Sequence, residues 1–544
     1  MAYESLRPWL QVLEQQGMFK WVDKEVDKDW EVGAIMRMIF RAMDEDNRYG
    51  IGFRNIKGHD GGRIVGGVVA ASRKMIATAL DCAPTLEAIH DRVTSGMNAP
   101  IEPVVVETGP VKEVIITGDD IDLHKLPVPI WTPEKDAGPY LTPLWVTKDP
   151  DTGRRNIGIR RCQIKSKNTT GILFGAPDRG GAIHHAKYKA RGEHMPAAIF
   201  IGGDPVQYLV APARYGADEL AVAGGIRGEA IEMVKCETID LEVPAHAEIV
   251  IEGEVLMDYT EPEGPFGEFT GYMAGGREGP VFRVTCITHR KDPIVMGVIS
   301  QFPPSESSMI KRALLEAGLK KHLTEDLNLP GIHDVHALEA GGGTATLWIS
   351  MKKMYSGHVD QTAFGTMGHF GMSYFKWIVI CDDDIDINDP FMRDWVMAWR
   401  VRADKDIALR AGAVIEEQFY AVRSFFKPGR PLVQMNGVRF HLLYGAGENF
   451  VQVGAVHLPK GCAVLGLIFR RVIKRDDLAG FMMFATHRVG AVDDFLHLVP
   501  QPKCNKHPRR VWRQGYAGAD LTQRCRFLED PNRHTGLLQS KGCD

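Results

Sequence analysis

The sequence predicts a multidomain α+β and α/β protein, in which a central β-barrel-like domain is flanked by an N-terminal α/β lobe and a C-terminal α/β domain. Its 544 residues are enough for two or three domains. Short β-rich runs separated by Gly/Pro turns fill the middle of the chain, and strands alternate with helical patterns beyond it. We therefore place the domains at residues 1–105, 106–330 and 331–544.

The N-terminal lobe is expected to begin with a helix that Ser5 caps. Apolar residues follow at helical spacing, namely Leu6, Trp9, Leu10 and Leu13. Strands are expected at residues 63–69, 104–106, 114–117, 249–251, 281–287, 294–299, 346–350 and 377–381.

The C-terminal stretch is harder to assign, because its hydrophobic periodicity is poor and four cysteines fall within residues 462–543. Residues 501–544 hold nine Lys/Arg against four Asp/Glu. Such a basic segment is typical of a solvated or disordered tail, and an electrostatic partner is the alternative.

The overall composition is that of a soluble protein, with 44% hydrophobic and 25% charged residues. No apolar run is long enough to span a membrane, and the net charge of −4 gives no reason to expect nucleic acid or membrane as a partner. The nine cysteines include no C-x-x-C pair, so neither a disulfide framework nor a zinc site is indicated. We expect a cytoplasmic protein with reduced thiols.

Two carboxylates five residues apart are the most informative feature. Residues 261–272 read EPEGPFGEFTGY. In an extended strand Glu263 and Glu268 would lie roughly 16 Å apart on opposite faces, but the Gly and Pro residues between them favour a tight turn that can aim both acids into one pocket. Repulsion and burial would raise one pKa while a nearby cation keeps the other acid ionised. The pattern indicates acid–base chemistry; the alternative is a turn with solvated acids.

The same segment resembles the E-G-P-(F/Y)-G-(E/D)-x-T-G-Y pattern of the UbiD family of decarboxylases, which use prenylated FMN. Other blocks resemble the family in the same order: NIGIRR at 156–161, DRGG at 178–181, Glu219, MVKC at 233–236, DLEVPAHAEIVIEG at 240–253, KKMYSGH at 352–358 and WIVICDDD at 377–384. The resemblance implies that the middle domain is a split flavin-binding β-barrel and that the C-terminal domain drives homo-oligomerisation.

The resemblance covers residues 1 to about 405, and residues 405–544 diverge from it. Relatives end in a tail whose lysine approaches the flavin, and Lys541 within Ser540-Lys541-Gly542 is a faint counterpart. Divergence, an added module or an upstream change of reading frame are the three explanations that remain open.

Carried over by position, Arg161, Glu263 and Glu268 resemble the catalytic Glu-Arg-Glu network of the family. The resemblance implies that Glu268 is the proton donor and that Arg161 pairs with Glu263 and with the substrate carboxylate. The planar guanidinium of an arginine can donate two parallel hydrogen bonds to a carboxylate. Its charge would hold Glu263 ionised and leave Glu268 free to take a raised pKa.

The resemblance also implies a cofactor site to which Arg161 contributes. In this site Asn156, Asp178 and Glu219 bind a divalent metal that bridges to the flavin phosphate, with K⁺ nearby. Oxygen ligands suit Mg²⁺ or Mn²⁺. Family members carry His where this chain has Asp178, so His184 or His185 is the alternative ligand.

Two further departures concern the 156–161 segment. Arg160 stands where an aromatic or small residue is common, which would change the charge of the pocket. Asn156 and Arg161 are separated by an odd number of residues, so an ideal strand would send them to opposite faces. A bulge or edge position near Gly158 would reconcile them.

The resemblance therefore predicts reversible, non-oxidative decarboxylation of an α,β-unsaturated, aromatic or heteroaromatic carboxylic acid with prenylated FMN, which a flavin prenyltransferase would supply. A cofactor is needed because loss of CO₂ from an sp² carbon leaves a charge that no protein side chain can delocalise. The alternatives are a subunit of a multi-component aromatic carboxylase and a non-catalytic flavin-binding scaffold.

Overall fold

The structure, a computed structural model, describes residues 3–174, 179–212, 218–369, 375–402, 406–412, 438–444 and 451–457. These residues belong to one compact unit, Met1–Ala463. Asp178, Lys541 and the basic segment at 501–544 lie outside the described residues.

The N-terminal lobe is built on a four-stranded sheet with the strand order β1-β2-β3-β18. Helix α1 begins after Ser5 and buries all four predicted apolar residues, although the Ser5 side chain makes no capping hydrogen bond. Strand β3 ends three residues before the predicted end at 69. The elements of this lobe are α1 (Leu6–Gln15), β1 (Phe19–Val22), a π-helix (Lys28–Val32), α2 (Gly33–Ala42), β2 (Gly50–Phe53), β3 (Arg63–Gly66), α3 (Arg73–Leu80) and α4 (Leu86–Asn98).

Strand β18 (Ile294–Gly297) pairs in parallel with β3, so a strand from the expected central range 106–330 completes the N-terminal sheet. The predicted domain borders stay a prediction, but the lobe is not a continuous piece of chain. This pairing brings the helix that follows β18 back beside the N-terminal lobe.

The central domain is a nine-stranded sheet, in which β5 pairs with β17 beside a path of eight strands ordered β6-β9-β10-β17-β14-β11-β7-β8. The predicted strands at 114–117, 249–251 and 281–287 are present, the last two within longer strands. The strands are β5 (Val114–Thr117), β6 (Tyr140–Leu141), β7 (Leu144–Lys148), β8 (Arg155–Ile159), β9 (Cys162–Ile164), β10 (Thr169–Ile172), β11 (Met195–Ile201), β14 (Ile249–Glu263) and β17 (Arg277–His289).

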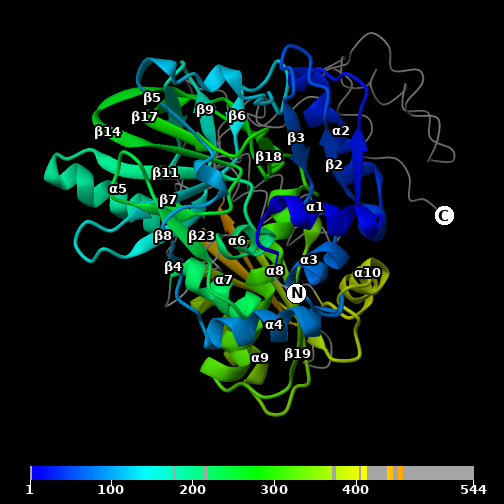
Figure 1. Cartoon of the computed structure of the whole chain (residues 1–544). Helices are drawn as coiled ribbons and strands as arrows, with labels where there is room; N and C mark the ends of the chain where they lie inside the picture. The colour runs from blue at the N-terminus through cyan, green and yellow to red at the C-terminus, as the bar shows by residue number, and fades with distance from the viewer. Residues whose placement is uncertain are drawn as a thin grey trace, which may run out of the picture. The chain divides into compact units, whose positions relative to one another are not determined.

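The connection between β8 and β9 shows that this sheet curls. Strand β8 lies at one end of the path and β9 lies next to the other end, yet only Arg160 and Arg161 join them. The backbone N–H of Arg160 donates to the carbonyl of Pro143, in the loop between β6 and β7. The two ends of the sheet must therefore approach each other, as in an incomplete barrel (Figure 1).

Four helices and two small sheets complete the central part. The first helical turn of α8 follows β18 closely, so this helix links the N-terminal sheet to the cavity described below. The elements are α5 (Gly180–Arg191), α6 (Pro205–Val210), α7 (Glu219–Arg227), α8 (Glu306–Lys321), the sheet of β4 (Val104–Val105), β12 (Glu232–Lys235) and β13 (Glu242–Pro244), and the ribbon of β15 (Phe266–Gly267) and β16 (Met273–Ala274).

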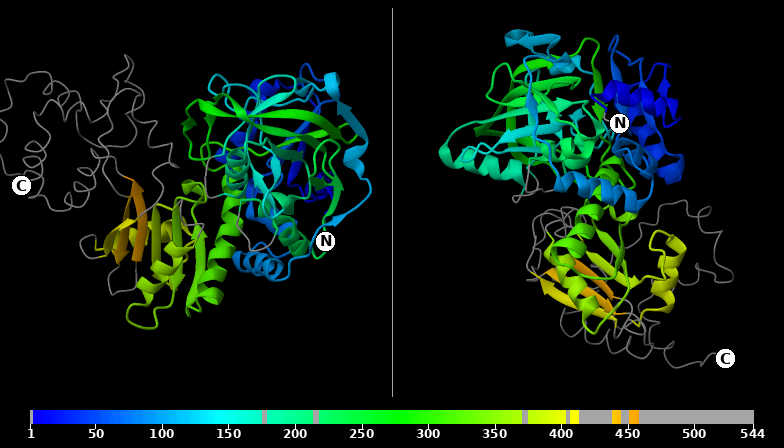
Figure 2. Two further views of the ribbon diagram at one scale, coloured as in Figure 1. Left: turned by 90° about the vertical axis from the view of Figure 1, so that its left-hand side faces the viewer. Right: turned by 60° about the horizontal axis from the view of Figure 1, so that its bottom comes forward.

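The C-terminal part contains a six-stranded sheet with helix α9 in contact with β21 (Figure 2). The predicted strands at 346–350 and 377–381 are both present and one residue longer. The elements are β19 (Ile332–Ala337), β20 (Thr346–Met351), α9 (His358–Gly368), β21 (Trp377–Asp382), α10 (Pro390–Trp399), β22 (Ile407–Gly412), β23 (Val438–Tyr444) and β24 (Val451–His457).

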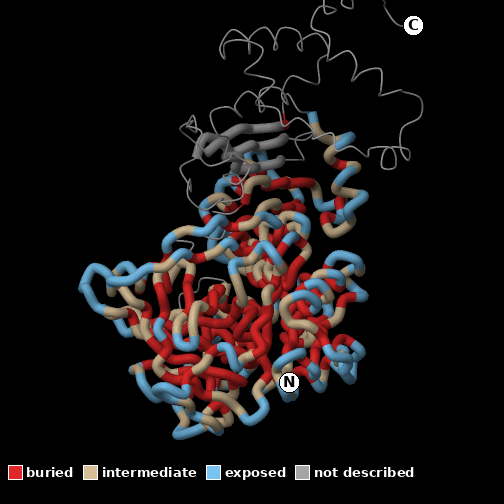
Figure 3. The backbone as a smooth tube through the Cα atoms, turned by 90° about the horizontal axis from the view of Figure 1, so that it is seen from above, coloured by how far each residue is buried: buried red, intermediate tan, exposed pale blue. Residues whose placement is uncertain are grey.

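The largest core cluster joins apolar side chains of the N-terminal lobe, the nine-stranded sheet and the first half of α8. Buried residues follow these strands, and exposed residues gather in the loops (Figure 3). The five cysteines of the described residues, Cys82, Cys162, Cys236, Cys286 and Cys381, are free thiols. In the part of the chain that the structure describes, no helix has the length and hydrophobicity needed to cross a membrane.

A buried carboxylate ties the lobe to the central sheet. Glu248, which precedes β14 and is fully buried, accepts hydrogen bonds from Arg7 Nε and Nη2 at 2.8 and 2.9 Å. It also accepts a hydrogen bond of 3.1 Å from the backbone N–H of Ile294, the first residue of β18. One side chain thus fixes α1 and β18 against β14.

Replacing Glu248 by alanine should therefore destabilise the protein by on the order of 3 kcal/mol, because it leaves Arg7 Nε and the backbone N–H of Ile294 without their acceptor. Arg7 Nη2 keeps the backbone carbonyls of Lys291 and Asp292 as acceptors. Glu254→Ala, on the strand β14 that follows Glu248, is the matched control. Its 2.9 Å pair with Arg283 is exposed and should contribute at most about 1 kcal/mol. Denaturant unfolding followed by tryptophan fluorescence measures both. Equal losses of stability would show that Glu248 has no special role.

Candidate active site

A cavity of about 1120 Å³ lies where the sheet curls. Its wall is formed by residues of β8, α5, α7 and α8 and by the segment that follows Glu263, from Phe266 to Ala274. Two of the three predicted catalytic residues, Arg161 and Glu268, line it directly, as do the predicted ligands Asn156 and Glu219.

The guanidinium of Arg161 donates two parallel hydrogen bonds to the carboxylate of Glu263. Arg161 Nε donates to Glu263 Oε1 at 2.8 Å, and Nη2 donates to Oε2 at 2.7 Å. Both residues are buried, with Arg161 8% and Glu263 1% exposed. The Phe266 ring covers the guanidinium, with 4.9 Å between the ring centroid and the central carbon. This bidentate arrangement fixes the plane of Arg161.

Glu268 contacts the same arginine, because its Oε1 accepts from Arg161 Nη1. The guanidinium is therefore placed between both acids. The two acids still differ, since the Glu268 side chain is 26% exposed and lines the cavity, whereas Glu263 is buried. Glu268 is thus the acid that faces a ligand.

The backbone between the acids explains how both reach Arg161. Strand β14 extends through Glu263, so this residue belongs to regular structure, which the sequence did not lead us to expect. Gly264 then adopts φ +85°, a left-handed conformation that favours glycine. After β15, the N–H of Gly271 donates to the carbonyl of Glu268 at 2.9 Å and closes a turn. The β14–β17 and β15–β16 pairings share one register, so the chain reverses at residues 268–272, after both acids. The tight turn predicted between Glu263 and Glu268 is therefore wrong, and only an interruption of the strand after Glu263 lies between them.

Glycines on β17, the neighbour of β14, and on β10, the next strand beyond β17, make room for Glu263. A Cβ atom at Gly171 of β10 would lie 3.3 Å from Glu263 Cγ, and one at Gly279 of β17 would lie 3.2 Å from Glu263 Cβ. Larger residues at these positions would press on the buried carboxylate. The sheet therefore holds an acid in its interior at the cost of two side chains that could have packed there.

Charge pairing dominates the electrostatics of this cluster. Burial alone would lower the pKa of Arg161, but the hydrogen bonds that Arg161 donates to Glu263 and the charges of both acids outweigh burial and raise that pKa. Burial, and next the negative charge of Glu263, raise the pKa of Tyr140, whose ring centroid lies 4.5 Å from that of Phe266. Arg161 is a permanent cation here, and Tyr140 keeps its proton.

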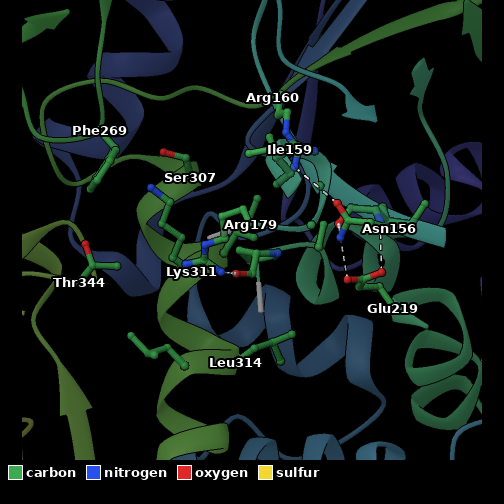
Figure 4. A pocket seen from close by; sticks show the side chains of 18 of the residues that line it. Asn156, Ile159, Arg160, Arg179, Glu219, Phe269, Ser307, Lys311, Leu314 and Thr344 are labelled. Carbon is green, nitrogen blue, oxygen red and sulfur yellow. Dashed lines mark hydrogen bonds between the residues drawn. The ribbon is translucent and has the colours of Figure 1, made fainter. Parts of the chain in front are cut away.

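A second cluster joins Asn156 of β8 to Glu219, the first residue of α7. Asn156 Nδ2 donates to Glu219 Oε1 at 2.9 Å, and the backbone N–H of Ile157 donates to Oε2 at 3.1 Å (Figure 4). Burial raises the pKa of Glu219, whereas the hydrogen bonds to it lower that pKa. The structure thus brings two of the three predicted metal ligands together.

Arg160 lies beside these two residues. Its Nη2 is 3.5 Å from Asn156 Oδ1, and its Nη1 is buried without a hydrogen-bond partner among the described residues. Cβ atoms at Gly158 and Gly181 would come within 2.5 Å of this guanidinium, so both glycines are needed for its position. Burial lowers the pKa of Arg160 to about 10. It remains charged at neutral pH.

Of the two explanations expected near Gly158, the bulge is wrong and the edge position is present, because β8 is the last strand of the sheet path. Gly158 pairs regularly with Trp145, and β8 keeps its register from Arg155 to Ile159. The chain instead leaves the strand at Arg160 and crosses to β9. Asn156 and Arg161 reach one cavity because the strand ends between them.

The two histidines proposed as alternative ligands already have partners. His184 Nδ1 lies 2.9 Å from Thr147 Oγ1, and burial lowers the pKa of His184 to about 4. His185 stacks on Phe174, with 4.7 Å between ring centroids. No cluster of three His, Cys, Asp or Glu side chains suited to a metal occurs within the described residues, which exclude Asp178.

Arg179 and Lys311 are among the cations of the cavity wall that were not predicted. Arg179 precedes α5, and its Nη1 donates to the carbonyl of Pro212 at 3.1 Å. Lys311 lies on α8, and its Nζ is 3.2 Å from the centroid of the Phe269 ring (Figure 4). Arg179 is part of the DRGG block, but Lys311 sits in an ordinary helical pattern with no local motif to mark it.

Comparison with known families accounts for most of the chain. Residues 10–93 match the 3-octaprenyl-4-hydroxybenzoate carboxy-lyase N-terminal domain, UbiD_N. Residues 103–303 match the Rift-related domain of the same carboxy-lyase, UbiD, and residues 308–433 match its C-terminal domain, UbiD_C.

Solved structures give the same result. An evolved dimeric form of the UbiD-class enzyme HmfF from Pelotomaculum thermopropionicum, in complex with prFMN, is 32% identical, with a TM-score of 0.68 over 75% of this chain and 92% of HmfF. The vanillic acid decarboxylase of Sedimentibacter hydroxybenzoicus is 29% identical, with a TM-score of 0.68 over 76% and 87%. The 3,4-dihydroxybenzoic acid decarboxylase AroY of Klebsiella pneumoniae is 25% identical, with a TM-score of 0.70 over 83% and 93%.

These matches agree with the multidomain α/β fold and its curled sheet. They cover all three parts of the fold, and one relative exceeds 30% identity over nearly its whole length. The chain belongs to the UbiD family and is a carboxy-lyase.

Proposed function

We propose that this protein catalyses the reversible, non-oxidative decarboxylation of an α,β-unsaturated, aromatic or heteroaromatic carboxylic acid, with prenylated FMN as its cofactor. The observation that carries the proposal is the Arg161 guanidinium held between a buried acid and an acid that faces a cavity. That unequal pair is the arrangement a decarboxylase needs, with one group to orient and one to deliver a proton. Binding of prFMN by HmfF supports the choice of cofactor.

The residues of the cavity fit a flavin phosphate. Arg160 has a buried nitrogen without a partner among the described residues, and it lies beside oxygen donors that suit Mn²⁺ or Mg²⁺, Asn156 and Glu219. These residues would hold the phosphate through a divalent metal, with Asp178 as the third ligand and K⁺ as a further ion. When bound, prenylated FMN supplies the electron sink for the charge that departure of CO₂ leaves on an sp² carbon.

The remaining steps are assigned to side chains of this chain. Glu263 fixes the plane of Arg161, and the free N–H groups of Arg161 meet the substrate carboxylate. Phe266 and its neighbours exclude water from the guanidinium. Glu268 donates a proton to the carbon that loses CO₂, and in the reverse direction it accepts that proton.

The proposal extends to the oligomeric state of the enzyme and to the source of its cofactor. We propose a homo-oligomer, for which the dimeric form of HmfF is the support, and a flavin prenyltransferase as the source of the cofactor. We place Lys541 near the flavin only by position in the sequence. Activity that appears only with a second polypeptide would favour the multi-component carboxylase instead.

Replacing Glu268 by glutamine tests the proton donor. The amide keeps the size and hydrogen bonding of the acid but cannot deliver a proton, so CO₂ release should fall by at least about 100-fold while the flavin content stays that of the wild type. Glu261→Gln is the control, because Glu261 comes from the same segment, bonds to Tyr259 and does not line the cavity. Wild-type CO₂ release by the Glu268 variant would remove Glu268 from the mechanism.

Replacing Glu219 by alanine tests the cofactor site. The change removes an anionic ligand and the acceptor of Asn156, so purified protein should retain less metal and less flavin. Metal analysis and the flavin absorbance of protein co-expressed with a flavin prenyltransferase measure both. Glu229→Ala, an exposed acid just after α7, should change neither. Full metal and flavin content in the Glu219 variant would refute this site.

A further inference from the structure

Lys311 is the one cavity residue described above whose role the proposed mechanism leaves open. Its neighbours at helical spacing, Ser307 and Leu314, line the same wall, so this face of α8 points into the cavity (Figure 4). The Nζ atom lies over the Phe269 ring at 3.2 Å from the centroid. Among the described residues no carboxylate forms a salt bridge with it.

The surroundings of Lys311 disfavour its positive charge unless an anion binds beside it. Burial lowers the pKa of Lys311 to about 8, Glu268 raises that pKa, and Arg179 lowers it further. An aromatic face compensates a buried ammonium only in part. An anion that binds beside Nζ would therefore offset the cost of burying this charge.

The charges of the site require such a cation. The charge of Arg161 is balanced by the two hydrogen bonds to Glu263, and Glu268 is neutral when it holds the proton that it is to deliver. These three groups then have no net charge, although the substrate brings a carboxylate. Arg160 is placed beside Asn156, at the end assigned to the phosphate. Of the two other cations described in the cavity wall, Arg179 donates to the carbonyl of Pro212, and Lys311 is the one whose charge interacts with Glu268. Lys311 thus provides a positive charge for the substrate beside the acid.

We infer that Lys311 is a substrate-binding residue that supplies the net positive charge for the substrate carboxylate, while Arg161, held by Glu263, orients it. The inference deepens the proposed function and rests on it. It also gives Lys311 a second use, because Glu268 becomes negative after it delivers its proton and then faces two cations, Arg161 and Lys311. The site therefore stays balanced before and after the proton moves.

The experiment measures binding separately from turnover. Holoprotein is titrated with a panel of aromatic, heteroaromatic and α,β-unsaturated acids, each beside its uncharged primary amide, by isothermal calorimetry. The wild type should bind at least one acid more tightly than its amide. Lys311→Met should reduce that preference by roughly 10-fold to 100-fold, the usual worth of a hydrogen bond to a charged group. Lys311→Arg should keep most of it.

Lys320→Met is the matched control, because it removes the same charge from the same helix outside the cavity lining, and it should keep the wild-type preference. An unchanged preference in Lys311→Met, or no preference for any acid in the wild type, would overturn the inference. CO₂ release is measured on the same panel. Release without an effect of Lys311 refutes only the inference, and an effect of Lys311 on binding without release from any acid refutes only the proposed decarboxylation.

Discussion

The two-residue connection between β8 and β9 is the constraint on which the site depends. Because Arg160 and Arg161 must span from one end of the sheet to the other, the sheet curls and its ends enclose a cavity. The same connection puts Arg161 at the inner side, within reach of the last residue of β14, Glu263. A longer loop would allow a flatter sheet and would release the arginine. Fold and site therefore share one structural cause.

The buried pair of Arg161 and Glu263 is better explained by function than by stability. Removing two charges from water costs several kcal/mol per ion, and a well-packed apolar pair of similar volume is often as stable or more stable. The protein nevertheless gives up side chains at Gly171 and Gly279 to accommodate the carboxylate. What the pair provides is a guanidinium of fixed orientation beside an acid, Glu268, that remains partly exposed. Preorganised charge of this kind is useful where charge develops during a reaction.

Local sequence patterns predicted individual helices and strands. How these elements pack together and form the site depends on contacts between residues that are distant in the sequence. The buried face of α1 and the strands at 346–350 and 377–381 follow from periodicity, which needs only neighbouring residues. Periodicity could not predict that β18 pairs with β3, because β3 lies far from β18 in the sequence, within the N-terminal lobe. The acids and Arg161 were found through motif and resemblance. Lys311 was missed because no sequence motif surrounds this lysine in its helix. Only the packing of α8 places it in the cavity wall.

The central claim is that the planar guanidinium of Arg161 holds Glu263 and Glu268 in place through hydrogen bonds to both. Arg161→Lys tests this claim most directly. Lysine keeps the charge but offers one compact ammonium on a flexible stem, which cannot hold Glu263 in two bonds and contact Glu268 as well. The account predicts holoprotein that retains its flavin and releases CO₂ at least about 100-fold more slowly, the cost expected for lost orientation of reacting groups. CO₂ release at the wild-type rate from this variant would contradict the account.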